Sequence, residues 1–482
     1  MPVTDVVVVG LGPAGIVATS VLATAGYSVT AIQTATANSD RCPVASPSST
    51  IRRRAWQRAV PAPYPQQGAD AVGGSKLLAA PQSYRLDPWN LRARSSTLTR
   101  YGASALPADA DLADWPFPAG ELDEYHQRVE RAMNVGVRPT ATWTRRMATT
   151  ADKLGWNSFT APAAASTDCS SLLDRARAVG HVDLLADAAV LGIETDSSGA
   201  VSGVRYVRDG EVCQLSAPAV VLAASVVSNA RLLLLSGITA RGQVGRYFMA
   251  HNCFVANGWF PGTDLGRDAA GPATATAVTS FEGDEFDHTG LGFLGGSILQ
   301  AAMTGPRTDG WRAAVAATLP DELSVPDRAT GWIREQQHSI GTVWAQPDQL
   351  PRAENRIDLD PTYVDALGRP VPRLTLDLAE DDHSRAAFLG DRMQEWLRAA
   401  GAHTTWVTPL VPQPLGTHLY GGTRMGLDPN ASVVDGYGRC HDVPGLVVVG
   451  SSTFPGTGGR GPVQTIEALA WRSAERLTED LR

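Results

Sequence analysis

The first residues whose types and spacing suggest chemistry are three glycines near the N-terminus. Gly10, Gly12 and Gly15 follow the β-branched run Asp5–Val9 and form the pattern GxGxxG. After a strand and before a helix, the first glycine permits a tight turn, the second lets the backbone approach a pyrophosphate, and the third lets helix and strand pack closely. The helix N-terminus adds free N–H groups and a positive dipole end. These residues predict a dinucleotide-binding turn.

A glutamine stands at the next position that such a site uses. The second strand is expected at Tyr27–Gln33, and it ends in Gln33 where dinucleotide-binding chains usually carry Asp or Glu. That carboxylate accepts hydrogen bonds from the adenosine ribose. The carbonyl oxygen of Gln33 can accept the same bonds, but without the assistance of a negative charge. We expect a moderate loss of adenine-nucleotide affinity rather than its abolition.

Ordered segments that would position this turn occur at both ends of the chain. Short β-branched runs predict buried parallel strands, and the alanine- or leucine-rich stretches beside them predict helices. The predicted strands are Asp5–Val9, Tyr27–Gln33, Pro218–Ala224 and Leu446–Val449, and the predicted helices are Ile16–Ala25, Val226–Leu235 and Val463–Leu477. Together they predict one Rossmann-type α/β domain assembled from both chain ends.

The middle of the chain predicts a second domain. Residues 251–414 are rich in Gly, Pro, Trp and Phe and contain one clear helical pattern, Asp381–Ala400. We therefore expect a nucleotide-binding domain from residues 1–250 and 415–482, with an irregular insertion at about 36–165. The residues between these two parts are expected to form the substrate domain.

Composition excludes several other classes of protein. The 482 residues carry a formal net charge of −8, which argues against a nucleic-acid or anionic-membrane partner. The five cysteines are scattered and lack CxxC spacing, so neither disulfides nor a metal site is expected. Glycines interrupt the N-terminal apolar run, which argues against a signal peptide and makes a cytoplasmic location the expectation.

Six stretches of the chain resemble segments of the glucose–methanol–choline (GMC) oxidoreductases, and they occur in the same order as in that family. The longest, His418–Leu477, begins HLYGGTRMG and includes the loop FPGTGGRGP. Within the family, the chain is most similar to the branch that contains pyranose oxidases and gluconate dehydrogenase large subunits. The other stretches are Asp5–Gly15, Val72–Arg92, Asp114–Val135, Val220–Gly237 and Glu354–Pro372.

This resemblance implies FAD as the cofactor, a Rossmann-type FAD domain, and a substrate domain with a mixed β-sheet. Pyranose oxidases carry a histidine that bonds covalently to the flavin, whereas this chain has Lys76 in that stretch, so we expect non-covalent FAD. The N-terminus of the last helix is expected to stabilise negative charge on the reduced flavin. The residues expected to contact FAD are Gly10, Gly12, Pro13, Ala14, Gly15, Gln33, Gly73, Gly74, Ser75, Val190, Ala223, Ala224, Ser451, Pro462, Val463, Gln464 and Thr465.

The resemblance also gives His418 a chemical role, because it occupies the position of the family's catalytic histidine. Alcohol oxidation needs a base with a pKa near the working pH, and histidine meets that need. We expect His418 to accept the hydroxyl proton while a hydride moves to the flavin. His251, in the stretch GRYFMAHN, is expected to be structural. Core packing is expected for Trp406 and Tyr420, and the alternative is that they line a pocket for a ring-shaped substrate.

The second catalytic position of the family departs from its usual residue. Relatives carry Asn or His before the proline of the last loop, and this chain has Gly461 there. A missing hydrogen bond to the developing alkoxide can cost about 3 kcal/mol in the transition state. Three explanations stay open: water or a substrate group fills the gap, Arg460 or another side chain substitutes, or the site has drifted from ordinary alcohol oxidation.

The expected function is FAD-dependent oxidation of an alcohol group. The subfamily resemblance alone points to a sugar, a cyclitol or a glycosylated natural product as the small-molecule substrate. Gly461 motivates an alternative, a redox-neutral, lyase-like enzyme in which FAD is structural. A non-catalytic flavin-binding protein is the third hypothesis. The sequence does not indicate whether oxygen or another carrier accepts the electrons.

Overall fold

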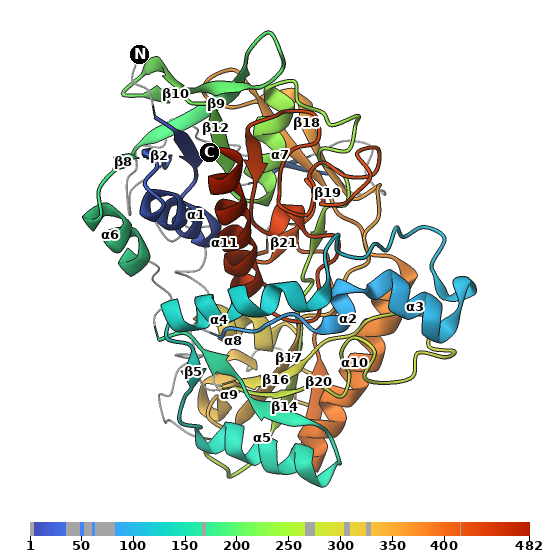
Figure 1. The fold of residues 1–482 in the computed structure, drawn as a ribbon. Helices are drawn as coiled ribbons and strands as arrows, with labels where there is room; N and C mark the ends of the chain where they lie inside the picture. Colours follow the sequence, from blue (N-terminus) through green and yellow to red (C-terminus); the bar gives the residue numbers. More distant parts are fainter. Residues whose placement is uncertain are drawn as a thin grey trace.

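The computed structural model describes residues 4–34, 49–52, 60–62, 82–165, 170–265, 275–302, 309–323, 329–414 and 416–482. Across these residues the chain is a mixed α/β protein with several sheets. Figure 1 shows two layered regions, one containing both chain ends and the other built mainly from the middle of the chain. No described helix combines the length and the apolar run that crossing a bilayer requires.

The first region is built on a five-stranded parallel sheet. Its strand order is β22-β12-β1-β2-β8, so a strand near the C-terminus joins the sheet that the N-terminal strand begins. Three of these strands are apolar runs buried along their length, as expected where helices cover both faces. The strands are β1 (Val6–Val9), β2 (Val29–Ile32), β8 (Val182–Leu185), β12 (Ala219–Leu222) and β22 (Leu446–Val448).

Helices from opposite ends of the chain pack together on this sheet. Figure 1 shows α1 (Pro13–Thr24, blue) beside α11 (Val463–Asp480, dark red), and the two helices are in contact. Their buried alanines and leucines share one core with β1 and β12. A third helix, α7 (Val226–Leu235), packs against the other core of this region and has the bounds that the sequence predicts.

The second region is built on a six-stranded sheet with the order β20-β14-β17-β16-β15-β6. Each neighbouring pair is antiparallel, so the expectation of a mixed sheet was wrong for this sheet. Antiparallel pairing suits strands that are joined through loops and hairpins rather than crossover helices. The strands are β6 (Ser158–Thr160), β14 (Phe254–Trp259), β15 (Ala275–Val278), β16 (Leu299–Ala302), β17 (Ile340–Ala345) and β20 (Thr404–Val407).

The two faces of the six-stranded sheet differ in composition because successive strand residues point to opposite sides. Leu299, Ala301 and Val343 point toward the helices α5 (Thr142–Lys153) and α10 (Glu380–Ala399), with which they form one apolar core. Residues one position away along the same strands, including Gln300 and Trp344, point to the opposite face. Helix α10 begins and ends one residue before the predicted segment Asp381–Ala400.

The remaining elements join and cover the two regions. The stretch 36–165, which was expected to be irregular, contains α2 to α5, so that expectation was wrong for most of its described part. A four-stranded sheet, β18-β19-β3-β4, includes one parallel pair. The remaining helices are α2 (Pro88–Leu91), α3 (Ala93–Tyr101), α4 (Asp123–Ala132), α6 (Ser170–Ala178), α8 (Asp309–Ala316) and α9 (Ala329–Gln336). The remaining strands are β3 (Ser49–Arg52), β4 (Val60–Ala62), β5 (Gly136–Val137), β7 (Pro162–Ala163), β9 (Ala188–Thr195), β10 (Val201–Arg208), β11 (Glu211–Ser216), β13 (Met249–Ala250), β18 (Arg356–Val364), β19 (Pro370–Thr375) and β21 (Leu419–Tyr420).

Candidate active site

The glycine-rich turn between β1 and α1 packs against the end of β12. Gly10 has a φ of 94°, and a Cβ at this position would lie 2.7 Å from both the carbonyl oxygen of Ala223 and the Cα of Ala224. A Cβ on Gly15 would lie 1.9 Å from the carbonyl oxygen of Gly10. Nothing lies within 4 Å of the Cβ position of Gly12, and no side chain caps α1. The turn therefore fits an approaching pyrophosphate.

Gln33 is buried at the end of β2 and touches the same turn. Its Oε1 accepts a hydrogen bond from the backbone N–H of Leu11 at 2.8 Å. The side chain therefore lies against the glycine-rich turn, as a ribose-binding residue would. Pro13 and Ala14 form the first turn of α1 beside it.

The other expected FAD contacts are spread over several elements. Asn229 links the ends of β12 and β22, because its Oδ1 accepts from the N–H of Ala224 at 2.8 Å and its Nδ2 donates to the hydroxyl of Ser452 at 2.9 Å. Ser451 lies in the same turn after β22, and Val190 lies in β9. The predicted contacts Gly73–Ser75 lie outside the described residues.

The side chains at the start of α11 are bonded to other protein groups. Gln464 accepts from the hydroxyl of Ser83 at 3.0 Å and donates to Glu130 at 2.7 Å. Thr465 lies 3.4 Å from Nε2 of His126. No side chain caps the first turn of α11. The backbone N–H groups of this turn, rather than the side chains of Gln464 and Thr465, are therefore the groups that could bind the flavin.

The predicted base, His418, lies beside a second histidine. The short strands β13 and β21 pair antiparallel and bring together the residues that flank them, so that Nδ1 of His418 lies 3.2 Å from Nδ1 of His251. Nε2 of His251 lies 2.7 Å from the carbonyl oxygen of Gly458, and the Tyr420 hydroxyl lies 3.2 Å from both ring nitrogens of His251. Nε2 of Gln346 lies 3.4 Å from Nδ1 of His418. Both histidines thus belong to one cluster.

Burial keeps both imidazoles neutral. Desolvation lowers the pKa of His418 to about 4, although the ring retains partial access to solvent. Desolvation, together with the nearby His418, lowers the pKa of His251 to about 3. This pKa lies below the value near the working pH that the sequence led us to expect, because burial disfavours the charged ring. The neutral imidazole still has one lone pair, so His418 can accept a hydrogen bond from a hydroxyl group at neutral pH.

Gly461 leaves space beside the His418 ring. A Cβ on Gly461 would lie 3.8 Å from Cε1 of His418 and 3.8 Å from Cδ2 of Tyr84, which is ordinary van der Waals contact. The backbone of Gly461 does not have the positive φ that would require glycine. The residue is therefore dispensable for backbone conformation, and its effect is to leave volume between the imidazole and the phenol ring.

Arg460 is held by other partners. Its Nε donates to Glu282 at 2.7 Å, its Nη2 makes a second bond to the same carboxylate, and its Nη1 donates to the carbonyl oxygen of Arg85 at 3.0 Å. Glu282 is buried, and burial raises its pKa to about 7 despite the pairing. These bonds connect the catalytic loop to the second region, and none of them goes to His418.

The face of the six-stranded sheet next to His418 carries polar atoms without partners. Nε2 of Gln300, Nε1 of Trp344 and Oε1 of Gln346 are buried and have no hydrogen-bond partner within the part of the chain that the structure describes. Gln300 and Trp344 are directly opposite each other in the β16–β17 ladder, and Gln300 accepts from the Tyr84 hydroxyl at 2.7 Å. Buried polar atoms usually have hydrogen-bond partners, and these three atoms lie on the face from which Gln346 contacts His418.

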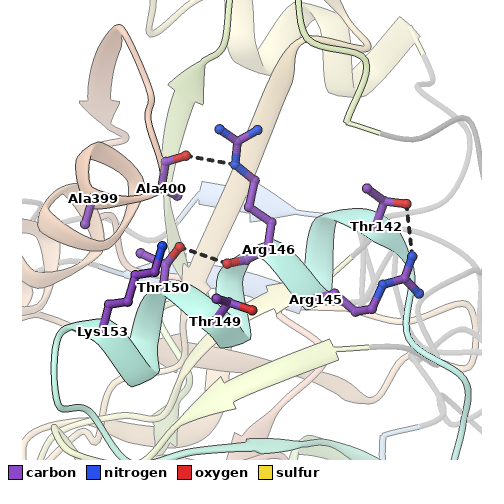
Figure 2. Close-up of a pocket in the computed structure, with 8 residues that line it drawn as sticks. All are labelled: Thr142, Arg145, Arg146, Thr149, Thr150, Lys153, Ala399 and Ala400. Atoms are coloured by element: carbon purple, nitrogen blue, oxygen red, sulfur yellow. Dashed lines mark hydrogen bonds between the residues drawn. The ribbon is translucent and has the colours of Figure 1, made fainter.

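A separate pocket of about 430 Å³ lies on the other side of this sheet. Figure 2 shows it between α5 and the end of α10, where Nε of Arg146 donates to the carbonyl oxygen of Ala400 at 2.8 Å. It contains none of the residues that contact His418. Its lining residues are Thr142, Arg145, Arg146, Thr149, Thr150, Lys153, Ala399 and Ala400.

Sequence reasoning missed several residues of the His418 cluster. His251 was expected to be structural and Tyr420 to pack in the core, and both are buried, but their contacts with the His418 cluster were not foreseen. Gln346 and Tyr84 were not considered at all. Trp406, in contrast, packs in an apolar cluster with α8 and α9, as expected. Only the family-like stretch around His251 offered a signal in the sequence.

Comparison with known proteins agrees with this geometry. A family model described as GMC oxidoreductase matches residues 351–470. The gluconate 2-dehydrogenase flavoprotein of Pantoea cypripedii is 26% identical over an alignment 591 positions long, gaps included, which covers 98% of this chain and 93% of that protein. The 2-methyl-1,2-propanediol dehydrogenase of Mycolicibacterium austroafricanum is 26% identical over an alignment 562 positions long, which covers 98% of this chain and 95% of that protein.

A shorter similarity has higher identity. Paromamine 6'-oxidase of Streptomyces fradiae is 38% identical over 138 residues, which cover 27% of this chain and 24% of that protein. The chain-long similarities accompany a glycine-rich turn that fits a pyrophosphate. Residues 351–470 match the GMC oxidoreductase family, and together with these similarities they identify an FAD-dependent alcohol oxidoreductase.

Proposed function

We propose that this enzyme oxidises an alcohol group of a sugar, a cyclitol or a glycosylated natural product, and that His418 accepts the hydroxyl proton. The observation that carries the proposal is a neutral imidazole 3.4 Å from the Gln346 amide, beside a sheet face on which three buried polar atoms have no partner among the described residues. A substrate rich in hydroxyl groups would supply the missing donors and acceptors. The names of two relatives, a gluconate dehydrogenase and a paromamine oxidase, support this substrate class.

We assign the cofactor site to the first region. In this proposal residues 1–250 and 415–482 form a Rossmann-type FAD domain from both chain ends, and residues 251–414 form most of the substrate domain. Because strand β6 joins the six-stranded sheet, we also assign part of the segment before residue 251 to the substrate domain. FAD is held without a covalent bond through the glycine-rich turn, Gln33 and the uncapped start of α11. Bound FAD supplies the acceptor for the hydride that leaves the substrate carbon.

The chain's own residues handle the proton and the orientation of the substrate. The hydroxyl proton of the substrate moves to a ring nitrogen of His418. At the carbon that bears this hydroxyl, the C–H bond breaks as the hydride leaves, and the C–O bond becomes C=O. Gln300, Trp344 and Gln346 hold the substrate's other polar groups. The Arg460 guanidinium already donates to the Glu282 carboxylate and to the Arg85 carbonyl oxygen. We therefore propose that Arg460 holds the loop Phe454–Pro462 in place and does not contact the substrate. The volume beside Gly461 is left to the substrate or to water.

Anaerobic mixing of the holoenzyme with sugars, cyclitols and aminoglycosides tests the proposal. Loss of the oxidised flavin band near ~450 nm, together with a carbonyl product, is the expected result. Conversion of the substrate without bleaching would instead favour the redox-neutral alternative that Gly461 raises. If no polyhydroxylated alcohol bleaches the flavin while a simple aliphatic alcohol does, the substrate class is wrong.

A further inference from the structure

His251 lies directly behind the predicted base and is more buried than the base. Its side chain is 2% exposed and belongs to the segment after β13, which pairs with β21. Its N–H groups and ring connect three parts of the molecule: the backbone N–H donates to the carbonyl oxygen of His418, Nε2 faces Gly458, and Nδ1 faces Nδ1 of His418. The position of this ring is therefore fixed from several sides.

The carbonyl oxygen of Gly458 decides which nitrogen of His251 carries the proton. A carbonyl oxygen can only accept, so the 2.7 Å contact requires a proton on Nε2. The ring is neutral, so Nδ1 then carries the lone pair. The Tyr420 hydroxyl can both donate and accept and lies equally far from both nitrogens, so it is compatible with this tautomer.

The lone pair on Nδ1 of His251 in turn decides the tautomer of His418. Two lone pairs facing each other at 3.2 Å would repel, so Nδ1 of His418 must carry a proton and donate it. The Gln346 side chain is compatible with this tautomer of His418 if its amide group is rotated by 180°. Its Oε1 is the atom without a partner, and exchanging the amide oxygen and nitrogen would place that oxygen next to the Nδ1–H of His418.

We propose that His251 is a positioning residue that holds His418 in the tautomer with its proton on Nδ1 and its lone pair on Nε2. The Gly458 carbonyl, His251 and His418 then form a directed chain whose last member presents a free acceptor for the substrate proton. This inference rests on the proposed role of His418 as the base. The role resembles that of any group that orients a catalytic imidazole through its second nitrogen.

The tautomer can be measured without any substrate, which separates this inference from the proposed function. In holoenzyme labelled with ¹⁵N-histidine, the signals of His418 are assigned through their loss in a His418→Asn variant. We expect a protonated Nδ1 and an unprotonated Nε2 at neutral pH. A proton on Nε2 of His418 in the wild-type enzyme would overturn the proposal, whatever the turnover of any alcohol.

A matched pair of substitutions tests the mechanism of this positioning. In His251→Asn the amide oxygen can replace the Nδ1 acceptor, whereas in His251→Gln the longer amide reaches toward Gly458 and leaves His418 without an acceptor. We expect the Gln variant to lose roughly 100-fold in kcat with little change in KM and to show mixed His418 tautomers. The Asn variant should retain most of kcat and the wild-type tautomer. Equal kcat in both variants, with FAD content and Tm preserved, contradicts the proposal.

Discussion

The two faces of the six-stranded sheet have opposite characters. On one face Leu299, Ala301 and Val343 pack against α5 and α10 in an apolar core, in which Nε1 of Trp143 is the buried polar atom that has no partner among the described residues. On the other face Gln300 and Trp344 carry buried polar atoms without partners next to the His418 cluster. Residues that are neighbours in the sequence, such as Leu299 and Gln300, therefore lie in different environments.

This difference separates stability from binding within a single sheet. Apolar burial on the α5–α10 face stabilises the fold, whereas each unpaired polar atom on the His418 face lowers the stability of the ligand-free protein by about 1–3 kcal/mol. Such a cost is expected where a ligand later supplies the missing bonds. Substitutions on the two faces should accordingly change different measured quantities.

The largest effect is expected from removing the predicted base. His418→Ala should lower the rate of flavin reduction by at least about 100-fold, because no other side chain then accepts the hydroxyl proton. The FAD content should stay at the wild-type level, since the glycine-rich turn is untouched. Stopped-flow reduction under anaerobic conditions measures the rate, and near-wild-type reduction would remove His418 from its role.

The next largest effect is expected on the apolar face. Leu299→Ala should lower the free energy of unfolding by about 2–5 kcal/mol, because it leaves a cavity in the core shared with α5 and α10. Denaturant unfolding of the holoenzyme measures this loss. The KM should not change, and a rise in KM with unchanged stability would show that the two faces are not independent.

A pair of tryptophan substitutions compares the faces with the same chemical change. Trp344→Phe removes an indole N–H that has no partner, so stability should hold or rise while KM for the alcohol increases about 2- to 10-fold. Trp396→Phe, on the apolar side, removes an N–H that donates to the Met147 carbonyl at 3.0 Å. This control should lose about 1–3 kcal/mol of stability with unchanged KM. The reverse pattern would contradict the assignment of the polar face to the substrate.

The buried histidine behind His418 predicts a direction of acid sensitivity. The folded-state pKa of His251 is lowered to about 3 from an ordinary value of 6.5, so the unfolded chain binds its proton first as the pH falls. Stability should therefore decline between about pH 6.5 and pH 3. Unfolding midpoints measured across this range should fall less steeply with pH in His251→Asn than in the wild-type enzyme. An equally steep fall in both proteins would show that His251 does not cause the loss of stability.

The smallest effect is expected at the cofactor's ribose. Gln33→Glu should tighten FAD binding roughly fivefold, because a carboxylate makes a stronger hydrogen bond to a hydroxyl and can still accept from Leu11. Titration of the apoprotein with FAD gives the Kd, with Gln33→Leu as the weakened control. Identical Kd values in all three proteins would show that this residue does not face the ribose.

The parallel sheet was predictable because its strands are local, apolar and β-branched. The strands β1 and β12 and the helix α7 lie within one or two residues of their predicted bounds. The six-stranded sheet was not predicted, because strands such as β16 (LQAA) are short and carry no β-branched residue. Strand β16 pairs with β15, more than 20 residues before it, and with β17, more than 40 residues after it, so its formation depends on distant partners.

The candidate site was predictable only where one residue carries a motif. His418 stands in the stretch HLYGGTRMG, and the turn at Gly10–Gly15 is a contiguous signature. The contact between His251 and His418 spans 167 residues, and the pairing of β13 with β21 that creates it involves only two residues of each strand. Such short strands have no recognisable hydrophobic periodicity, so the sequence pattern does not predict their pairing. The unpartnered atoms on the sheet were likewise visible only after the strands were placed.

The position of β22 and α11 beside β12 and α1 has a consequence for biosynthesis. The strand β22 is translated only after all the other strands of that sheet have been made. During translation, the growing polypeptide must therefore keep one edge of its N-terminal sheet uncovered, and such exposed edges are prone to aggregation. We expect a chain truncated before β22 to aggregate for the same reason.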